Sequence, residues 1–169
     1  DSFNWDQLEV LRGSASMLFG RGSTGGAVNQ VSKRPTLVDQ NEVAVTAGTG
    51  QHTRTLADLN VRTGESAALR LNAMVTRADN EGVPTDSYGV APTLRWGIGT
   101  RHEFTASLYH LRNHNGIQYG LPWLTPGPKA GGNFLWKSDP ANYYGMASDY
   151  AQSGTTQGTL VHRVRIDDE

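Results

Sequence analysis

Apolar and polar residues alternate along much of the chain after residue 41, in segments of about ten positions. Alternation with a period of two predicts β-strands with one apolar face, and strands of ~10 residues can cross a bilayer at a tilt. In the clearest segment, residues 88–98, one face carries Tyr88, Val90, Pro92, Leu94, Trp96 and Ile98. The pattern predicts six antiparallel strands, over residues 42–49, 53–63, 69–76, 88–98, 103–113 and 156–166.

Two of these segments leave a question open. In residues 103–113, the series Phe104, Ala106 and Leu108 competes with Tyr109 and Leu111 for the apolar face. In residues 88–98, Pro92 contradicts the rule that central strands exclude proline, and the sequence suggests only a bulge or a local kink there. Both segments are nevertheless predicted to be strands.

The connections between the predicted strands differ in length. Residues 63–66 and 97–101 are short connections, residues 79–87 are longer, and residues 114–155 are very long. Alternating short turns and long loops are typical of outer-membrane barrels, where the long loops are extracellular. A soluble antiparallel sandwich also has alternating strands, but a connection as long as residues 114–155 is unusual inside a compact domain. The lengths therefore favour a transmembrane barrel over a soluble sandwich.

Composition narrows the functional classes only a little. The formal net charge is −1, with 37% hydrophobic and 18% charged residues, so the chain has neither the basic excess of a nucleic-acid-binding protein nor a disordered composition. No apolar run approaches the ~18 residues of a transmembrane helix. The mean hydropathy of −0.49 is compatible with a barrel, whose inward residues are polar. The chain has no cysteine, which excludes disulfides and thiolate metal sites.

A glycine-rich tract lies near the start of the chain. It begins with a predicted strand around Leu8 and Val10, continues with a helical turn at residues 15–19, and ends with a predicted strand at residues 27–31. Residues 20–25 match G-x-G-x-x-G, the motif of dinucleotide-binding loops. Such a loop follows a strand and opens a helix, whereas here the helical turn precedes the glycines and a β-like run follows them. A nucleotide-dependent oxidoreductase is therefore the weaker interpretation.

The order of motifs over residues 8–35 resembles the C-terminal part of the plug domain of TonB-dependent outer-membrane receptors. The matching features are a strand, Arg12-Gly13, the run ending in Phe19-Gly20, the glycine-rich tract and Asn29 to Pro35. Ser14 stands where the family usually has proline, but both residues suit the first turn of a helix. The resemblance implies the end of a plug at residues 1–37 and the first barrel strands at 42–169. The chain would then be an internal fragment.

The resemblance also assigns expected roles to individual residues. In the family, the arginine of the Arg-Gly motif is held by glutamates of the inner barrel wall, which implies that Arg12 locks the plug to the barrel. The alternative is a solvated arginine at a strand end. Trp96 and Phe104 flank the short turn around Gly99 and are expected to face lipid at the periplasmic interface, as part of an aromatic girdle.

The long connection holds half of the aromatic residues of the chain. Aromatic side chains offer a large rigid contact area and suit a flat, partly apolar ligand. Residues 116–123 resemble the third extracellular loop of siderophore receptors, the catecholate subgroup looking closest, which implies that Tyr119, Trp123 and Trp136 contact a ferric chelate. The alternative is that these rings pack against neighbouring loops. His110 and His114 would lie ~13 Å apart along a strand, so no metal site and no cofactor are expected.

Together, the pattern and the resemblance predict a mainly β fold: the end of a plug followed by about six antiparallel strands of an incomplete transmembrane barrel. The implied function is uptake of a ferric siderophore across the bacterial outer membrane, energised by the TonB complex, without enzymatic activity. The implied partners are the siderophore, the TonB complex and outer-membrane lipid, but no nucleic acid. A passive porin or an adhesin is the main alternative.

Overall fold

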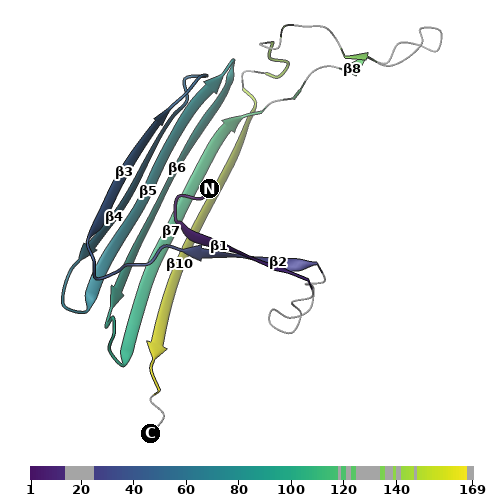
Figure 1. Cartoon of the computed structure of the whole chain (residues 1–169). Coiled ribbons are helices and arrows are strands. Elements are labelled where there is room, and N and C mark those ends of the chain that lie inside the picture. The colour runs from purple at the N-terminus through teal and green to yellow at the C-terminus, as the bar shows by residue number, and fades with distance from the viewer. Residues whose placement is uncertain are drawn as a thin grey trace.

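A computed structural model describes residues 1–13, 25–117, 119–120, 123–124, 134–135, 139, 142–146 and 148–166. The described residues form antiparallel β-structure: one large sheet, a hairpin that projects from it, and a short strand pair in the long connection (Figure 1). Among these residues, no helix is long and apolar enough to cross a membrane. The helical turn predicted at residues 15–19 and most of the glycine-rich motif lie outside the described residues.

The large sheet contains the six predicted strands, each paired with its neighbour in the sequence. They are β3 Gln40–Ala47, β4 Thr53–Arg62, β5 Ala67–Asn80, β6 Val83–Trp96, β7 His102–Gly116 and β10 Tyr150–Val164, in the spatial order β3-β4-β5-β6-β7-β10. The prediction of six antiparallel strands is confirmed. The sheet is open, with β3 and β10 at its two edges.

The connection predicted to be long at residues 79–87 is instead a two-residue turn, so this prediction is wrong. Asn80 pairs with Val83, and Glu81 and Gly82 between them have φ angles of 53° and 89°. Positive φ at both central positions is typical of the type I′ hairpin turn. The amide of Gly82 also donates a 3.0 Å hydrogen bond to the Asp79 carboxylate. Asp79, Asn80 and residues 83–87, which the prediction assigned to the connection, are paired extensions of β5 and β6.

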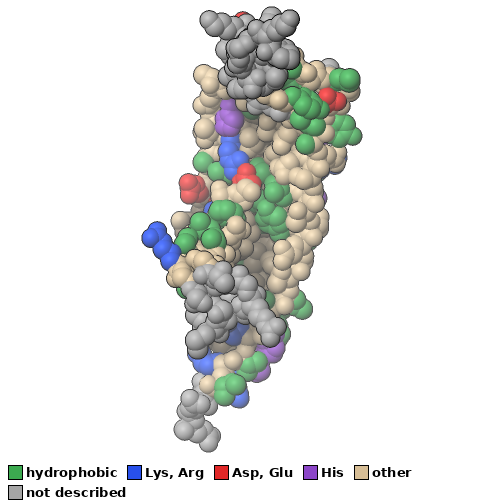
Figure 2. Space-filling view, turned by 90° about the vertical axis from the view of Figure 1, so that its right-hand side faces the viewer, with side chains coloured by type: hydrophobic (Ala, Val, Ile, Leu, Met, Phe, Trp, Pro, Cys, Tyr) green, Lys and Arg blue, Asp and Glu red, His purple; other side chains and the backbone are tan. Residues whose placement is uncertain are grey.

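The two faces of the sheet differ in chemistry, because side chains alternate along each strand. On the outer face, apolar residues from neighbouring strands lie side by side, as in the row Val61, Leu69, Leu94, Ala106 and Leu160. The opposite, inner face carries the hairpin, and much of it is neither hydrophobic nor charged (Figure 2). The open question about β7 is thereby answered: Phe104 pairs with Trp96 on the outer face, whereas Tyr109 and Leu111 face inward.

Pro92 is accommodated by a gap in the β-ladder. It pairs with Leu71 of β5, but the pairing of β6 with β7 is interrupted between Val90 and Thr93. Because proline has no backbone N–H, it cannot donate a ladder hydrogen bond at this point. The irregularity predicted from the sequence is therefore a local loss of pairing on one side of β6.

The hairpin consists of β1 Trp5–Arg12 and β2 Gly26–Ser32, and it extends away from the inner face of the sheet (Figure 1). The strand predicted at residues 27–31 corresponds to β2. Where the start of the chain meets the sheet, Phe3, Met74 and Ala91 form a small buried core. Leu56, Tyr109 and Leu111 pack around this core. In the long connection, β8 Trp123–Leu124 pairs with β9 Phe134–Leu135.

Candidate functional site

Phe3 fits into a notch in the inner face of the sheet. Its side chain is 5% exposed and packs against the ring of Tyr109, with 5.5 Å between the ring centroids. The notch exists because residue 89 is glycine: a Cβ atom there would lie 2.8 Å from Phe3 Cε1. Gly89 is thus required by the close approach of Phe3.

Polar contacts on either side of Phe3 attach the same segment to β4 and β5. The Asp1 carboxylate accepts hydrogen bonds of 2.9 and 2.7 Å from the Arg54 guanidinium. Asn72, which is fully buried, donates a 3.1 Å hydrogen bond to the side-chain oxygen of Asn4. The Asn72 Oδ1 atom has no hydrogen-bond partner among the described residues. Breaking the hydrogen bond between Asn72 and Asn4 would leave a further buried polar group without a partner, which costs free energy. The bond therefore holds Asn4 in place.

The segment that follows the hairpin is held by a cluster of charges. Asp58 of β4 accepts two 2.7 Å hydrogen bonds from Arg70 of β5, and the same carboxylate lies 2.8 Å from Lys33 Nζ. Arg70 also donates a 3.0 Å hydrogen bond to the carbonyl oxygen of Arg34. The three charged side chains are only 13–23% exposed, so water screens their interaction less than at an open surface.

A second cluster holds the next residue of this segment. Arg95 of β6 donates a 3.1 Å hydrogen bond to the carbonyl oxygen of Pro35, and hydrogen bonds of 2.8 and 3.0 Å to the Glu103 carboxylate. Arg163 of β10 lies 3.7 Å from the same carboxylate. Glu103 thus lies between two cations, Arg95 and Arg163. Arg95 also binds Pro35, which follows the hairpin.

Asn60 of β4 completes the attachment. Its side-chain nitrogen donates hydrogen bonds to the carbonyl oxygens of Thr36 and Val38, at 2.9 and 2.7 Å, and its oxygen accepts from the Thr36 amide at 3.0 Å. Thr36 and Val38, which lie between the hairpin and β3, are therefore fixed to the sheet. Sequence analysis missed these anchors, although inward positions of β4 to β6 that carry Arg, Asp and Asn were a signal for them.

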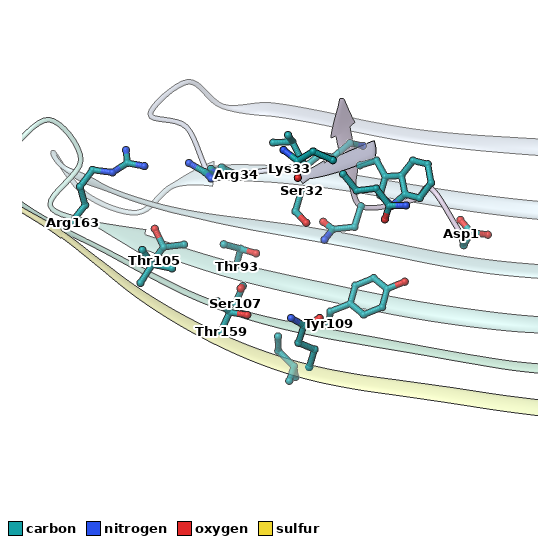
Figure 3. Close-up of a pocket in the computed structure, with 18 of the residues that line it drawn as sticks. Asp1, Ser32, Lys33, Arg34, Thr93, Thr105, Ser107, Tyr109, Thr159 and Arg163 are labelled. Carbon is teal, nitrogen blue, oxygen red and sulfur yellow. The ribbon is translucent and has the colours of Figure 1, made fainter. Parts of the chain in front are cut away.

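A cavity of about 640 Å³ lies between this attached segment and the sheet. Figure 3 shows hydroxyl groups of β6, β7 and β10 on its floor and Lys33 and Arg34 on the opposite side. The floor carries Thr93, Thr105, Ser107, Tyr109 and Thr159. The lining combines neutral hydrogen-bonding groups with charges of both signs, because Asp1 and Glu103 border the cavity as well as Lys33, Arg34 and Arg163.

Of the residues predicted to bind ligand, Tyr119 is the best described. It is 59% exposed, and its hydroxyl donates a 3.1 Å hydrogen bond to the Asp149 carboxylate. This hydrogen bond raises the pKa of the Tyr119 phenol above its ordinary value. Asp149 also accepts a 3.0 Å hydrogen bond from the Met146 amide, and Gly145 leaves room for the Tyr119 ring. The two ends of the long connection are thereby joined at Tyr119.

The other predicted site residues lie apart from these contacts. Trp123 belongs to β8, and Trp136 lies outside the described residues. Arg12 is exposed at the far end of β1, opposite Gly26, and the attachments described above are made by other residues. A role of Arg12 as a lock stays a prediction.

The rings predicted to form part of an aromatic girdle lie together on the outer face. Trp96 and Phe104 are stacked with 5.2 Å between centroids and 9° between planes, and His162 stacks on Phe104 at 4.1 Å. The rings of Trp96 and Phe104 thus share the outer face, in line with that expectation. Within the described residues, no group of three or more His, Asp or Glu side chains is placed to hold a metal ion.

Comparison with known proteins identifies the family. No family model matches the chain. The chain is 33% identical to the catecholate siderophore receptor Fiu of Escherichia coli K12 over 178 residues, which cover 99% of the chain and 23% of that receptor. It is 30% identical to the probable TonB-dependent siderophore receptor PiuA of Acinetobacter baumannii, over 95% of the chain and 22% of that receptor. The chain is homologous to part of a TonB-dependent siderophore receptor.

Solved structures of such receptors agree with this assignment. A crystal structure of the ferric-catecholate import receptor Fiu has a TM-score of 0.86 at 30% identity, and that of PiuA has 0.84 at 28%. Each covers 99% of the chain, which matches 27% and 24% of the two receptor chains. We therefore call residues 1–13 and 25–32 the plug hairpin, residues 33–38 the link, and the six-stranded sheet the barrel wall. The open sheet accords with a chain that spans about a quarter of these receptors.

Proposed function

We propose that the chain forms part of an outer-membrane receptor that imports ferric siderophores of the catecholate type, driven by the TonB complex. The observation that carries this proposal is the two-faced wall: an apolar outer face, and a polar inner face to which the plug hairpin is attached. Residues 1–37 are the end of the plug, and residues 42–169 the first barrel strands. Similarity to receptors named for catecholate siderophores supports the ligand class.

The outer face has the dimensions that a membrane requires. Its apolar part runs along β6 from Tyr88 to Trp96, which at ~3.4 Å per residue is roughly 27 Å of strand. With the usual tilt of ~40°, this corresponds to about 20 Å of height, close to the ~25 Å apolar band of outer-membrane barrels. Beyond Tyr88, Arg77 and Asp86 form a solvent-exposed ion pair at 3.3 Å. Trp96 and Phe104 then face lipid at the periplasmic rim.

The long connection carries the extracellular binding site in this proposal. Tyr119, Trp123 and Trp136 contact the ferric chelate through their rings. The hydrogen bond between Tyr119 and Asp149 supports this role, because a ring already held in place loses less conformational entropy on binding. Gly120, with a φ angle of 76°, turns the backbone between Tyr119 and β8.

Import requires that the plug changes its contacts with the wall. Arg12 is the proposed lock of the plug hairpin, with glutamates of the inner barrel wall as its partners. The contacts of Phe3, Asn4 and the link form a second set of attachments on the described part of the wall. A pull by the TonB complex, an inner-membrane machine driven by the proton-motive force, then rearranges the plug within the barrel.

The proposal can be tested by measuring growth of cells that receive a single ferric chelate as their iron source. Cells that lack the complete receptor should grow poorly when a ferric catecholate is their only iron source, and expression of the intact receptor should restore growth. Uptake of labelled chelate should stop when the proton-motive force is abolished. Energy-independent uptake would instead indicate a passive porin, and nucleotide binding by the purified receptor would favour an oxidoreductase.

A further inference from the structure

The outer face of β7 departs from the apolar pattern of the wall near the long connection. Tyr109 and Leu111 point inward. The outward positions next to them are therefore His110, Arg112 and His114. Arg112 and His114 are exposed, and His110 is half-buried. We call these three outward residues the basic stripe.

Neighbouring strands carry different side chains at the same level of the outer face. Arg112 faces Tyr88 of β6, and its row continues through Val75 of β5 and Thr55 of β4 to Val45 of β3. Apart from the threonine, these neighbours are apolar or aromatic. The basic stripe is thus a local feature of β7 and not simply the end of the apolar part of the wall.

The surroundings of the basic stripe are defined within the chain. β7 is paired with β6 on one side and with β10 on the other, so both neighbouring strands are described. Phe3 and Asn4, which precede the plug hairpin, attach to the opposite face of the sheet. The basic stripe therefore lies on the face that is turned away from the plug.

Tyrosine rings border the basic stripe on both sides. Tyr88 lies against His110 with 5.7 Å between ring centroids, and Tyr150 of β10 lies against His114 with 4.8 Å. Both tyrosines are exposed on the outer face. Tyrosine is enriched at membrane–water interfaces, where the ring lies in the apolar region and the hydroxyl meets the headgroups. The two rings thus place the basic stripe at the level of lipid headgroups.

Neutral side chains orient two members of the stripe without cancelling their charge. With its oxygen turned toward Arg112, the Gln152 amide accepts hydrogen bonds of 2.8 and 3.3 Å from the guanidinium. His110 Nδ1 lies 2.8 Å from the hydroxyl oxygen of Thr156. A guanidinium has five N–H donors, so two bonds to Gln152 leave it able to bind an anion as well.

The carboxylate that faces the stripe is already paired. Asp86 faces His114 across β6 and β7, and it lies 3.3 Å from Nε of Arg77. Its repulsion of an anion bound at Arg112 is therefore reduced by the neighbouring cation.

We propose that the basic stripe binds a phosphate group of a glycolipid in the outer leaflet of the membrane, with Arg112 as the main contact. A guanidinium binds phosphate through paired, charge-assisted hydrogen bonds, and the imidazoles beside it can donate further ones. A cation on the lipid-facing surface is costly near the bilayer centre and is tolerated near the interface. The inference rests on the proposed function, which places the long connection outside the cell (Figure 1).

A lipid titration of charge-removing variants is the direct experiment. The complete receptor, purified in detergent, is titrated with bisphosphorylated lipid A and, separately, with lipid A from which both phosphates have been removed. Arg112→Gln removes the proposed contact. Arg101→Gln is the matched control, because it removes another exposed cation, just before the opposite end of β7.

Arg112→Gln should lower the affinity for bisphosphorylated lipid A by about fivefold or more, and Arg101→Gln by less than about twofold. Arg112→Lys keeps the charge but not the paired geometry, so its affinity should lie between those of Arg112→Gln and the wild type. Equal affinities of Arg112→Gln and the wild type would overturn the inference. Equal binding of the dephosphorylated lipid by the wild type would overturn it too.

A gain of affinity is a test that a misfolded variant cannot pass. Asp86→Asn removes the carboxylate beside the stripe and releases Arg77, so it should raise the affinity for bisphosphorylated lipid A about twofold or more. This gain should shrink at higher ionic strength. Unchanged or lower affinity in a normally folded variant would overturn the placement of the phosphate beside the stripe.

Two further outcomes separate this inference from its alternatives. Phosphatidylglycerol that binds as tightly as lipid A would overturn the assignment to a glycolipid. A changed oligomeric state of Arg112→Gln with unaltered lipid binding would overturn the inference and indicate a protein interface instead. The titration contains no siderophore, so failure to import ferric catecholates would refute the proposed function without affecting the lipid result.

Discussion

Asp58 and Lys33 join the barrel wall to the link through an ion pair of 2.8 Å, and Arg70 holds the same carboxylate from the neighbouring strand. One acidic side chain thus orients two basic ones, and one of these also binds the backbone of Arg34. Loss of Asp58 would affect two of the link attachments at once, those at Lys33 and Arg34. Asp58 is therefore the first target for substitution.

Asp58→Asn should weaken the seating of the plug by about 2 kcal/mol, because two half-buried cations lose their shared carboxylate. The measurement is the midpoint of denaturant-induced release of the plug, followed by limited proteolysis of the intact receptor. Asp86→Asn is the control, since the exposed pair of Asp86 with Arg77 should contribute less than ~1 kcal/mol. A result in which both variants match the wild type would show that the ion cluster does not hold the link.

Gly89→Ala should destabilise the attachment of Phe3 by about 1–3 kcal/mol, because the added methyl group meets the ring at 2.8 Å and the ring must move. Phe3→Leu provides a smaller side chain at the same place. In a double-mutant cycle, the cost of Gly89→Ala should be much smaller in the Phe3→Leu background. Additive effects would mean that the two residues do not interact.

Tyr119→Ala combined with Trp123→Ala should lower the affinity for a ferric catecholate by about tenfold or more, since aromatic anchors contribute strongly to binding. Barrel insertion should be unchanged, because the loop contributes little to the strand ladder. Equilibrium binding of labelled chelate to intact cells measures the affinity. Tyr144→Ala, at another exposed aromatic residue of the connection, is the control. Normal affinity with normal surface expression would move the site to other loops or to the plug.

Arg12→Ala in the complete receptor should loosen the plug by more than ~1 kcal/mol if the arginine is held by buried glutamates. Leakage of a large antibiotic through the barrel is the measurement. Arg77→Ala serves as the surface control, because Arg77 lies in a well-exposed ion pair. Arg12 is an ordinary strand-end residue if leakage and plug stability remain at the wild-type level.

The sequence predicted the strands well where alternation was strict. Leu94 and Trp96 marked the outer face of β6, whereas the sequence left the facing of β7 open, and only the pairing of Phe104 with Trp96 in the structure decides it. The pattern failed at residues 79–87, which lie beyond the apolar part of the wall, where Asp86 pairs with Arg77 of β5. There, polar side chains on both faces remove the alternation although the backbone is still paired.

The plug attachments were harder to predict. Asp58 and Lys33 are far apart in the sequence, as are Phe3 and Gly89, and neither pair has a local pattern that indicates contact. From the sequence, Gly89 is only a small residue in a strand. Its role becomes clear in the structure, where Phe3 occupies the space that a larger side chain would fill. Contacts between distant segments depend on the three-dimensional arrangement, which alternation alone does not determine.

The position of Asn60 has a mechanical consequence. The chain leaves the link and enters β3 at Gln40, so a force transmitted along it from the plug would separate β3 from β4 one residue pair at a time. The side chain of Asn60 donates hydrogen bonds to Thr36 and Val38, just before β3 begins. The contacts of Lys33 with Asp58 and of Pro35 with Arg95 lie further upstream in the chain. A pull on the plug therefore loads these attachments first, and the first strand of the barrel is shielded from tension.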